Sequence, residues 1–243
     1  MGVSIICINE TNSHWKKNYF LQRFTSILKK TWSFNKISFC VSESKLNFHS
    51  DIKPGGTAMM VLNPISSAIT STAQDPWGMR RWANFTILGE DLRQTSILNV
   101  YRACNTSIET AGSTTAVKQQ WLLMQRTNRQ EHPYKATIDD LIVEIKKKQQ
   151  NKHEIIVTMD GIKEFSSSKR GITKLCRECK LYDVFSQRFK NVKLSNTHIK
   201  GSKRIYYILC SFNILTAINQ SDMTVFGELV ISDHLFNIST GFS

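Results

Sequence analysis

The chain has 243 residues, 41% of them hydrophobic, which is enough to bury one sizeable core. Nothing in this length requires a second domain, so we expect a single domain over residues 1–243. Lysine and arginine number 32 against 19 acidic residues, giving a formal charge of +13 and a pI near 9.6. This balance favours a polyanionic partner such as DNA or RNA, although charge alone does not choose between nucleic acid and a membrane surface.

The sequence does not indicate a membrane-spanning or secreted protein. The longest apolar stretch, residues 205–218, is interrupted by Ser211 and Asn213 and is too short to cross a bilayer. The N-terminus lacks a basic region and a small-residue cleavage site, so we expect an intracellular location, with the nucleus as one alternative. We also expect a monomer without a small-molecule cofactor.

The six cysteines lack the spacing of a disulfide framework or of a zinc site. Only Cys176 and Cys179 form a Cys-x-x-Cys pair, and no second Cys or His pair stands at a comparable spacing. We therefore expect buried, reduced thiols and no structural zinc.

In the first half of the chain, short β-branched runs alternate with turn residues. Thr11-Asn12-Ser13 offers a helix N-cap, and Lys53-Pro54-Gly55-Gly56 and Asp75-Pro76-Trp77-Gly78 are turn sequences. The pattern predicts a strand over residues 3–8, a helix over residues 15–32, and antiparallel strands over residues 37–41, 57–62, 82–88 and 96–101.

The second half continues in the same way. Its spacing predicts helices over residues 116–124, 138–148 and 171–181, and strands over residues 154–159, 205–209, 225–226 and 235–238. Strands and helices are interleaved without repeats or low-complexity linkers, which is typical of an α/β protein.

The predicted helix over residues 15–32 combines apolar and basic side chains. Its aromatic and aliphatic residues recur at helical spacing, whereas the basic residues fall largely elsewhere around the helix: Lys16, Lys17, Arg23, Lys29 and Lys30. A solvated basic face explains this arrangement.

Two acidic residues, Glu10 and Asp160, stand at the ends of predicted strands. Open α/β sheets assemble their sites at strand ends, and paired carboxylates suit an oxygen-seeking ion such as Mg²⁺. A strand-terminal acid is also a common cap or turn residue, so both interpretations stay open for either residue alone.

The tripeptide Ser232-Asp233-His234 is the sharpest chemical signal in the chain. An imidazole can be presented to a phosphate while a carboxylate fixes its tautomer and charge, as phosphodiester hydrolysis requires. An Asp-His pair in a loop is often only structural, so the order of the motifs along the chain has to decide.

That order resembles the endonuclease/exonuclease/phosphatase family, and within it the endonucleases of non-LTR retroelements. Glu10-Thr11-Asn12 with Trp15 resembles the glutamate strand of the family. Six further segments are similar to successive landmarks of the retroelement subgroup: Lys53-Pro54-Gly55-Gly56-Thr57, Asp75-Pro76-Trp77-Gly78 through Arg81-Trp82, Asn99-Val100-Tyr101-Arg102, Asp160, Gly201-Ser202-Lys203-Arg204-Ile205 and Ser232-Asp233-His234. The resemblance covers residues 6–235 and implies a four-layer α-β-β-α sandwich of two packed mixed β-sheets flanked by helices.

The resemblance also implies a role for each matching residue. Glu10 would bind Mg²⁺, with Mn²⁺ as an alternative, and Asp233 would belong to the same metal region. Tyr101 and His234 would contact the scissile phosphate, and Asp160 would orient the attacking water. These roles agree with elementary chemistry: a hard cation neutralises the developing charge, a carboxylate activates water, and protein donors hold the nonbridging oxygens.

Three departures from the family pattern predict weakened activity. Ile162 stands where the family has an Asn two residues after the catalytic Asp160, and it forms no side-chain hydrogen bond. Tyr206 stands where the family has an Asp that would orient His234, and a phenol carries no charge near neutral pH. The chain also begins only nine residues before Glu10, so we expect it to lack the first strand of the family fold.

The leading hypothesis is therefore a Mg²⁺-dependent phosphodiesterase that resembles a retroelement DNA endonuclease nicking target DNA, with impaired activity in this copy. A nucleic-acid-binding relative without catalysis is the first alternative, and a phosphatase of the same fold is the second. Candidate DNA contacts lie in loops or at strand ends, and Arg102 and Arg204 are favoured because each adjoins a family landmark. The full set is Lys53, Arg80, Arg81, Arg102, Lys200, Lys203 and Arg204.

Overall fold

The structure is a computed structural model of the whole chain. It describes residues 4–15, 17–31, 37–44, 53–62, 64–89, 92–161, 170–190, 204–223 and 237–242. By its internal contacts the chain divides into two compact units, Met1–Thr137 and Ile138–Ser243. The single domain expected from the sequence stays a prediction.

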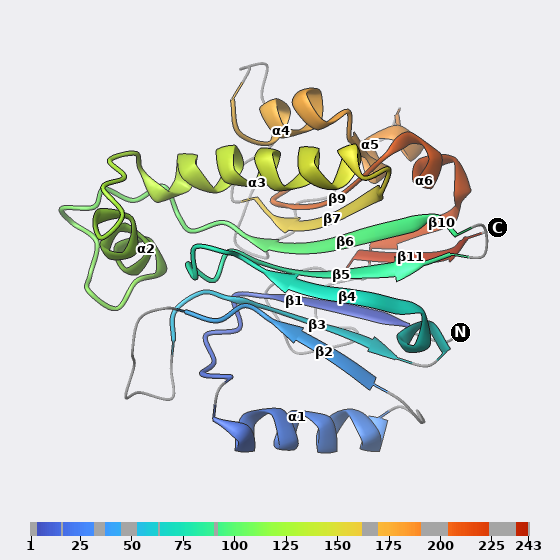
Figure 1. Cartoon of the computed structure of the whole chain (residues 1–243), viewed down its shortest axis with the longest axis horizontal. Coiled ribbons are helices and arrows are strands. Elements are labelled where there is room, and N and C mark those ends of the chain that lie inside the picture. The colour runs from blue at the N-terminus through green and yellow to red at the C-terminus, as the bar shows by residue number, and fades with distance from the viewer. Residues whose placement is uncertain are drawn as a thin grey trace. The chain divides into compact units, whose positions relative to one another are not determined.

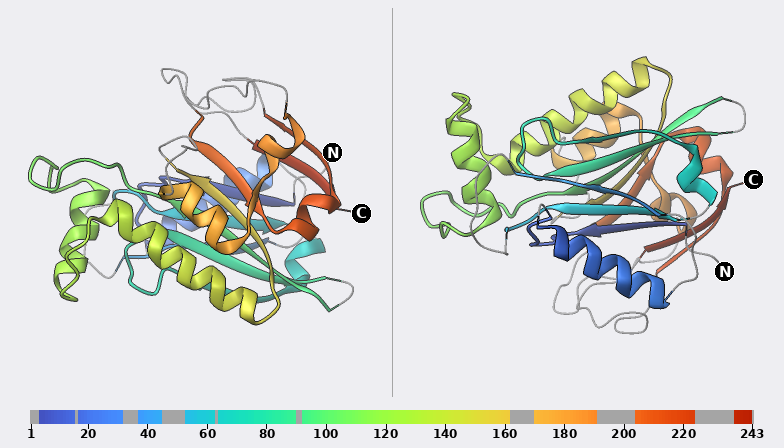
Figure 2. Two further views of the ribbon diagram at one scale, coloured as in Figure 1. Left: turned by 90° about the horizontal axis from the view of Figure 1, so that it is seen from above. Right: turned by 60° about the horizontal axis from the view of Figure 1, so that its bottom comes forward.

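The first unit contains a three-stranded antiparallel sheet with the order β1-β3-β2 (Figure 1). Its strands are β1 (Ile5–Asn9), β2 (Ile37–Val41) and β3 (Thr57–Leu62), which confirms three predicted strands. All six residues of the central strand β3 are buried, and five of them form the apolar run 58–62. The helix α1 (Asn18–Thr31) lies along one face of this sheet (Figures 1 and 2).

A second group of strands in this unit runs antiparallel in the order β4-β5-β6. These strands are β4 (Ile69–Gln74), β5 (Trp82–Leu88) and β6 (Gln94–Tyr101), and a 3₁₀ turn, η1 (Pro64–Ala68), precedes them. The sequence did not predict β4, because five of its six residues are exposed and mostly polar. Hydrophobic alternation is a signal only where one face of a strand is buried.

Asn99 of β6 connects the two groups of strands. Its side-chain amide is fully buried and donates hydrogen bonds to the backbone oxygens of Ile8 in β1, at 2.9 Å, and Ala58 in β3, at 3.1 Å. Burying an amide that has two hydrogen-bond partners costs little folding free energy, and it favours one arrangement of the strands. Burying an amide without partners would destabilise the fold. The bonds therefore fix where β1 ends relative to β6.

Two helices follow β6. The helix α2 (Ala116–Gln125) begins after Thr115, whose hydroxyl accepts a hydrogen bond from the Lys118 backbone, and α3 (Pro133–Gln150) starts at a proline. Proline suits the first position of a helix because the missing N–H has no partner there. The helix was predicted to begin only at Ile138.

In the second unit, β9 (Tyr206–Cys210) pairs antiparallel with both β7 (Glu154–Asp160) and β8 (Tyr182–Asp183). The helix α4 (Gly171–Cys179) is joined to α3 by the ion pairs Lys174–Asp139, at 2.7 Å, and Lys146–Glu178, at 2.8 Å.

Two short helices and a strand pair complete the second unit. These are α5 (Val184–Arg188), α6 (Phe212–Ala217), β10 (Ile218–Met223) and β11 (Asn237–Phe242), and the two strands run antiparallel. The strand predicted at residues 225–226 lies outside the described residues, and the one predicted at 235–238 overlaps β11. Within the part of the chain that the structure describes, no helix combines the length and the apolar character needed to cross a membrane.

Candidate active site

The loop that carries Glu10 is hydrogen-bonded to the turn before β3. Glu10 and Asn12 both adopt the left-handed region, with φ of 51° and 48°. The backbone N–H groups of Thr11 and Asn12 donate to the oxygens of Gly56 and Gly55, at 3.2 and 3.0 Å. In return, the Asn12 side chain accepts from the Gly55 N–H at 2.7 Å. These bonds stabilise two uncommon backbone conformations. Such conformations are found most often at functional sites.

Arg80 holds this loop from within the protein. Its buried guanidinium donates to four backbone oxygens on three separate segments: Lys53 at 2.6 Å and Pro54 at 3.4 Å, Ser13 at 2.8 Å, and Ser42 at 3.4 Å. Burial lowers the pKa of Arg80 to about 10, while the charge of Glu43 acts in the opposite direction, so the group is protonated at neutral pH. Arg80 was a candidate DNA contact; its burial and backbone bonds give it a structural role instead.

Tyr101 ends β6 beside Glu10. Its hydroxyl donates to Oε1 of Glu10 at 3.4 Å, a long hydrogen bond, while its ring is buried. The ring lies against Gly55, where a Cβ would come within 2.7 Å of Tyr101 Cε1. Glu10 and Tyr101 border a cavity of about 670 Å³, whose other walls include Asn12, Cys104, Thr115 and Gln119.

Replacing Gly55 by Ala is expected to lower the free energy of unfolding by about 1 to 3 kcal/mol, since its φ of 71° is strained for any residue with a Cβ. The added methyl group would also clash with the Tyr101 ring. Gly112→Ala is the matched control, because the Cβ there would lie 3.8 Å from the nearest atom, Thr115 Cγ2. Urea unfolding of both variants tests this; equal midpoints would contradict the close packing.

The Glu10 carboxylate is suited to act as a ligand of Mg²⁺. Its carboxylate is exposed and borders the cavity, and Mg²⁺ in phosphate-processing sites is commonly held by one or two carboxylates, water and substrate phosphates. The described residues contain no cluster of three or more His, Cys, Asp or Glu side chains that could enclose a metal. The Glu10 carboxylate therefore suits an ion whose other ligands are water and substrate.

In the second unit, Asp160 and Tyr206 lie opposite each other at the end of β7 and the start of β9. The Tyr206 hydroxyl donates to Oδ2 of Asp160 at 3.4 Å. Gly161, which follows, has Ile172 so close that a Cβ would lie 2.4 Å from its Cδ1. Asp160 is thus buried at a tightly packed strand end, where the resemblance places the residue that orients water.

The structure brings together Glu10 with Tyr101 in the first unit and Asp160 with Tyr206 in the second. Five other predicted site residues lie outside the described residues: Ile162, Lys200, Lys203, Asp233 and His234. Their roles stay predictions.

The prediction that Arg81 contacts DNA is not supported by the structure. It is fully buried and forms a two-point ion pair with Asp75, Nε to Oδ2 at 2.8 Å and Nη2 to Oδ1 at 2.9 Å. The same carboxylate accepts from the backbone of Trp77 and Met79, both at 3.1 Å. Arg81 therefore closes the turn before β5 and offers no donor to a surface phosphate.

The two favoured arginines are buried as well. Arg102 donates from Nε to the Tyr134 oxygen at 2.8 Å, with its guanidinium carbon 3.3 Å from the centre of the Tyr134 ring. Arg204 pairs with Asp183 at 2.6 Å. Lys53, likewise buried, pairs with Glu43 at 3.3 Å. These three predictions of surface phosphate contacts are not supported, because buried and paired cations stabilise the fold around the site without facing solvent.

Sequence reasoning gave no role to Asn99 and the wrong kind of role to Arg80. The signal for Asn99 was a polar residue inside the apolar run of β6, where an amide needs buried partners. For Arg80, three backbone segments distant in sequence provide the partners, and no local pattern reveals them.

The two thiols of the Cys-x-x-Cys pair are expected to react slowly. Burial raises the pKa of Cys176 from 9.0 to about 12 and that of Cys179 to about 11. At pH 8 we expect the thiolate of Cys176 to be about 1000-fold less abundant than that of an ordinary thiol, and so to react correspondingly slowly with a disulfide reagent. The exposed Cys104 should react rapidly, and equally fast labelling of all six cysteines would contradict this.

The sequence matches no protein-family model and no curated protein. Solved structures match the fold. An AP endonuclease from Leishmania major has a TM-score of 0.61 at 11% identity, over 99% of this chain and 79% of that one. An AP endonuclease from Archaeoglobus fulgidus has a TM-score of 0.59 at 15% identity, over 98% and 88%. The 3′ phosphatase NExo from Neisseria, bound to a product DNA hairpin, has a TM-score of 0.57 at 13% identity, over 99% and 100%.

At these identities the similarity shows the fold alone. The predicted α/β fold, with two mixed sheets and flanking helices, is thereby confirmed over nearly the whole chain.

Proposed function

We propose that this chain, which has the endonuclease/exonuclease/phosphatase fold, is a metal-dependent phosphodiesterase acting on DNA. The observation that carries the proposal is the pairing of Glu10 and Tyr101, an exposed carboxylate fixed beside a buried phenol hydroxyl at the rim of one cavity. A fixed carboxylate and a fixed hydrogen-bond donor at one cavity are the parts that phosphate chemistry needs.

Each residue has a specific task in this proposal. Bound Mg²⁺ would supply a positive charge that stabilises the phosphorane and the leaving oxygen. Glu10 would hold the ion, and the Tyr101 hydroxyl would donate a hydrogen bond to a nonbridging oxygen. For the second unit, the resemblance supports the proposal that Asp160 orients the attacking water and that His234 and Asp233 contact the phosphate and the metal.

The finer assignment, a retroelement-type endonuclease that nicks target DNA, rests on the sequence landmarks. The net charge of +13 supports a polyanionic substrate, and the Neisseria phosphatase of similar fold was solved with DNA. We further propose an intracellular location, with the nucleus as one alternative.

A nucleic-acid-binding protein without cleavage is the second candidate. The observation that favours it is the Tyr206 hydroxyl bonded to Asp160, at the position where the resemblance expects an Asp that orients His234. A neutral phenol cannot stabilise an imidazolium as a carboxylate does, so we expect slow turnover.

A duplex oligonucleotide labelled at either end tests the reaction type. Incubation with Mg²⁺ should give internal cuts with 3′-hydroxyl ends, and EDTA should prevent them. Stepwise shortening from the 3′ end, or release of a terminal phosphate alone, would assign the site to an exonuclease or a phosphatase. Binding without any product would favour the second candidate.

A further inference from the structure

The helix α1 and its flanks form the most one-sided charge distribution in the first unit. Between Glu10 and Glu43 the sequence contains six basic residues and no acidic one: Lys16, Lys17, Arg23, Lys29, Lys30 and Lys36. Of these, Arg23, Lys29 and Lys30 are exposed on α1, and none of the ion pairs formed among the described residues includes them. Their charge therefore faces solvent uncompensated.

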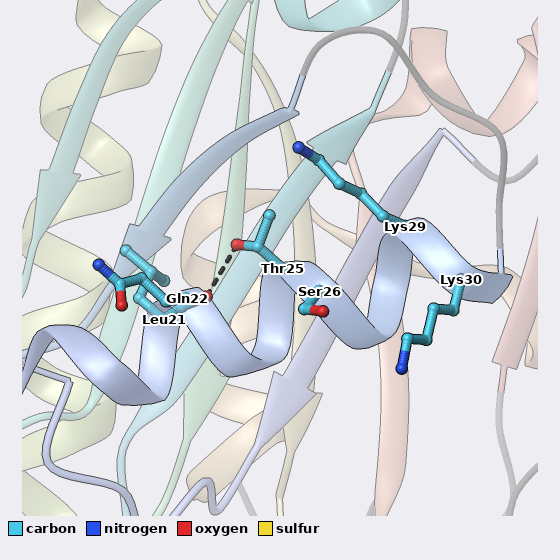
Figure 3. Close-up of a pocket in the computed structure, with 6 residues that line it drawn as sticks. All are labelled: Leu21, Gln22, Thr25, Ser26, Lys29 and Lys30. Atoms are coloured by element: carbon cyan, nitrogen blue, oxygen red, sulfur yellow. Dashed lines mark hydrogen bonds between the residues drawn. The ribbon is translucent and has the colours of Figure 1, made fainter.

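A groove of about 640 Å³ runs along this helix, and two of the three cations line it (Figure 3). The lining residues are Leu21, Gln22, Thr25, Ser26, Lys29 and Lys30. Gln22 and Ser26 are exposed and offer an amide and a hydroxyl between the charges. Amides, hydroxyls and ammonium groups are the donors that proteins direct at phosphate and sugar oxygens.

Helix stability explains only part of this arrangement. Lys29 and Lys30 lie in the last turn, where cations interact favourably with the helix dipole. Arg23 lies in the middle of the helix, where that explanation does not apply. Its position one to two turns before the lysines extends the positive charge along the helix.

We infer that the exposed face of α1, defined by Arg23, Lys29 and Lys30 with Gln22 and Ser26, binds the phosphate backbone of nucleic acid outside the catalytic pocket. This deepens the proposed function, since it rests on DNA as the partner. The α1 face also carries exposed cations that a phosphate can approach, whereas the arginines predicted as DNA contacts are buried. The seven-residue separation of Arg23 and Lys30 spans about 10 Å, the length over which one DNA strand carries about three phosphates.

A membrane surface fits this face less well. A helix that lies in a bilayer interface needs a broad apolar face to insert. On α1 the apolar residues Phe20, Leu21 and Phe24 are half-buried and Leu28 is buried, so most of that face is already covered. Only Tyr19, 47% exposed, and Ile27, 52% exposed, remain as large apolar side chains.

The test is equilibrium binding of a fluorescent DNA duplex in EDTA over a range of salt, so that cleavage plays no part. The triple variant Arg23→Gln, Lys29→Gln, Lys30→Gln keeps helix-forming side chains and removes three charges. The matched control is Lys147→Gln, Lys152→Gln, Lys180→Gln, three exposed lysines of the second unit. Thermal melts of both variants verify that they fold.

We expect the α1 variant to bind about tenfold or more weakly at low salt, with the slope of log K against log salt reduced by about 3, because each phosphate contact contributes about 0.9. The control should change that slope by less than about 1. Equal losses in the two variants, or no binding by the unaltered protein, would overturn the inference. Absence of nicking in a separate Mg²⁺ assay would overturn the proposed catalysis and leave this binding result standing.

Two further arms sharpen the test. Arg23→Gln alone leaves the helix C-terminus intact and should lower the salt slope by about 1. Vesicles of phosphatidylcholine with phosphatidylserine test the lipid alternative. Vesicle binding that depends on the three α1 charges, with unchanged DNA binding, would assign the face to a membrane and contradict the inference.

Discussion

Replacing Asp75 by Ala is expected to lower the free energy of unfolding by about 3 to 5 kcal/mol, because it leaves the fully buried guanidinium of Arg81 without its counter-charge. The substitution also removes the acceptor for the Trp77 and Met79 backbone groups in the turn before β5. Urea unfolding at neutral pH measures the loss from the shift in midpoint.

A double variant, Asp75→Leu with Arg81→Met, is the control for this effect. It replaces both charges with apolar groups, and removing a whole buried pair usually costs much less than breaking one. We expect it to recover the part of the loss that the unpaired Arg81 charge causes, because the Trp77 and Met79 backbone groups lose their acceptor in both variants. A loss below about 1 kcal/mol for Asp75→Ala alone would show that Arg81 reaches solvent, and the original prediction of a DNA contact would then return.

Replacing Glu10 by Gln is expected to reduce Mg²⁺-dependent cleavage by about 100-fold or more, because the amide keeps the shape of the side chain but loses the charge that binds the ion. Stability should change little, since Glu10 is exposed. Tyr101→Phe should cost less, about tenfold, because it removes one hydrogen-bond donor from the phosphate. Single-turnover rates on a labelled duplex provide the measurement.

Glu109→Gln is the matched control for Glu10→Gln. Glu109 is an exposed carboxylate of the same unit, outside the cavity, and its removal changes the net charge equally. Its rate should equal that of the unaltered protein. Equal rate losses for both substitutions would mean that the effect is one of overall charge, and Glu10 would no longer be a metal ligand.

How far the fold could be read from the sequence depended on burial. The strands β2, β3 and β5 have the predicted bounds because their apolar runs are buried against the rest of the unit. The exposed, polar β4 gave no such signal. The start of α3 was placed five residues late because the helical spacing of apolar residues begins at Ile138, whereas Pro133 already fixes the first turn.

The resemblance gave site roles to Glu10 and Tyr101, and the structure places these two side chains side by side. Partners that are distant in sequence could not be predicted. The arginines were misjudged because a positive charge in a loop looks the same in sequence whether it meets solvent or a buried partner. Asp75 and Arg81 stand six residues apart, at no regular helix or strand spacing, so only the folded turn reveals the pair.

Nicking of supercoiled plasmid by the unaltered protein and by Glu10→Gln, each with Mg²⁺ and with EDTA, tests the central claim most directly. The account predicts slow conversion to open circles by the unaltered protein with Mg²⁺ only, and at least about 100-fold slower conversion by Glu10→Gln. Nicking at equal rates by both proteins would place the chemistry elsewhere. No nicking by a folded protein that binds DNA would contradict catalysis and leave a nucleic-acid-binding protein.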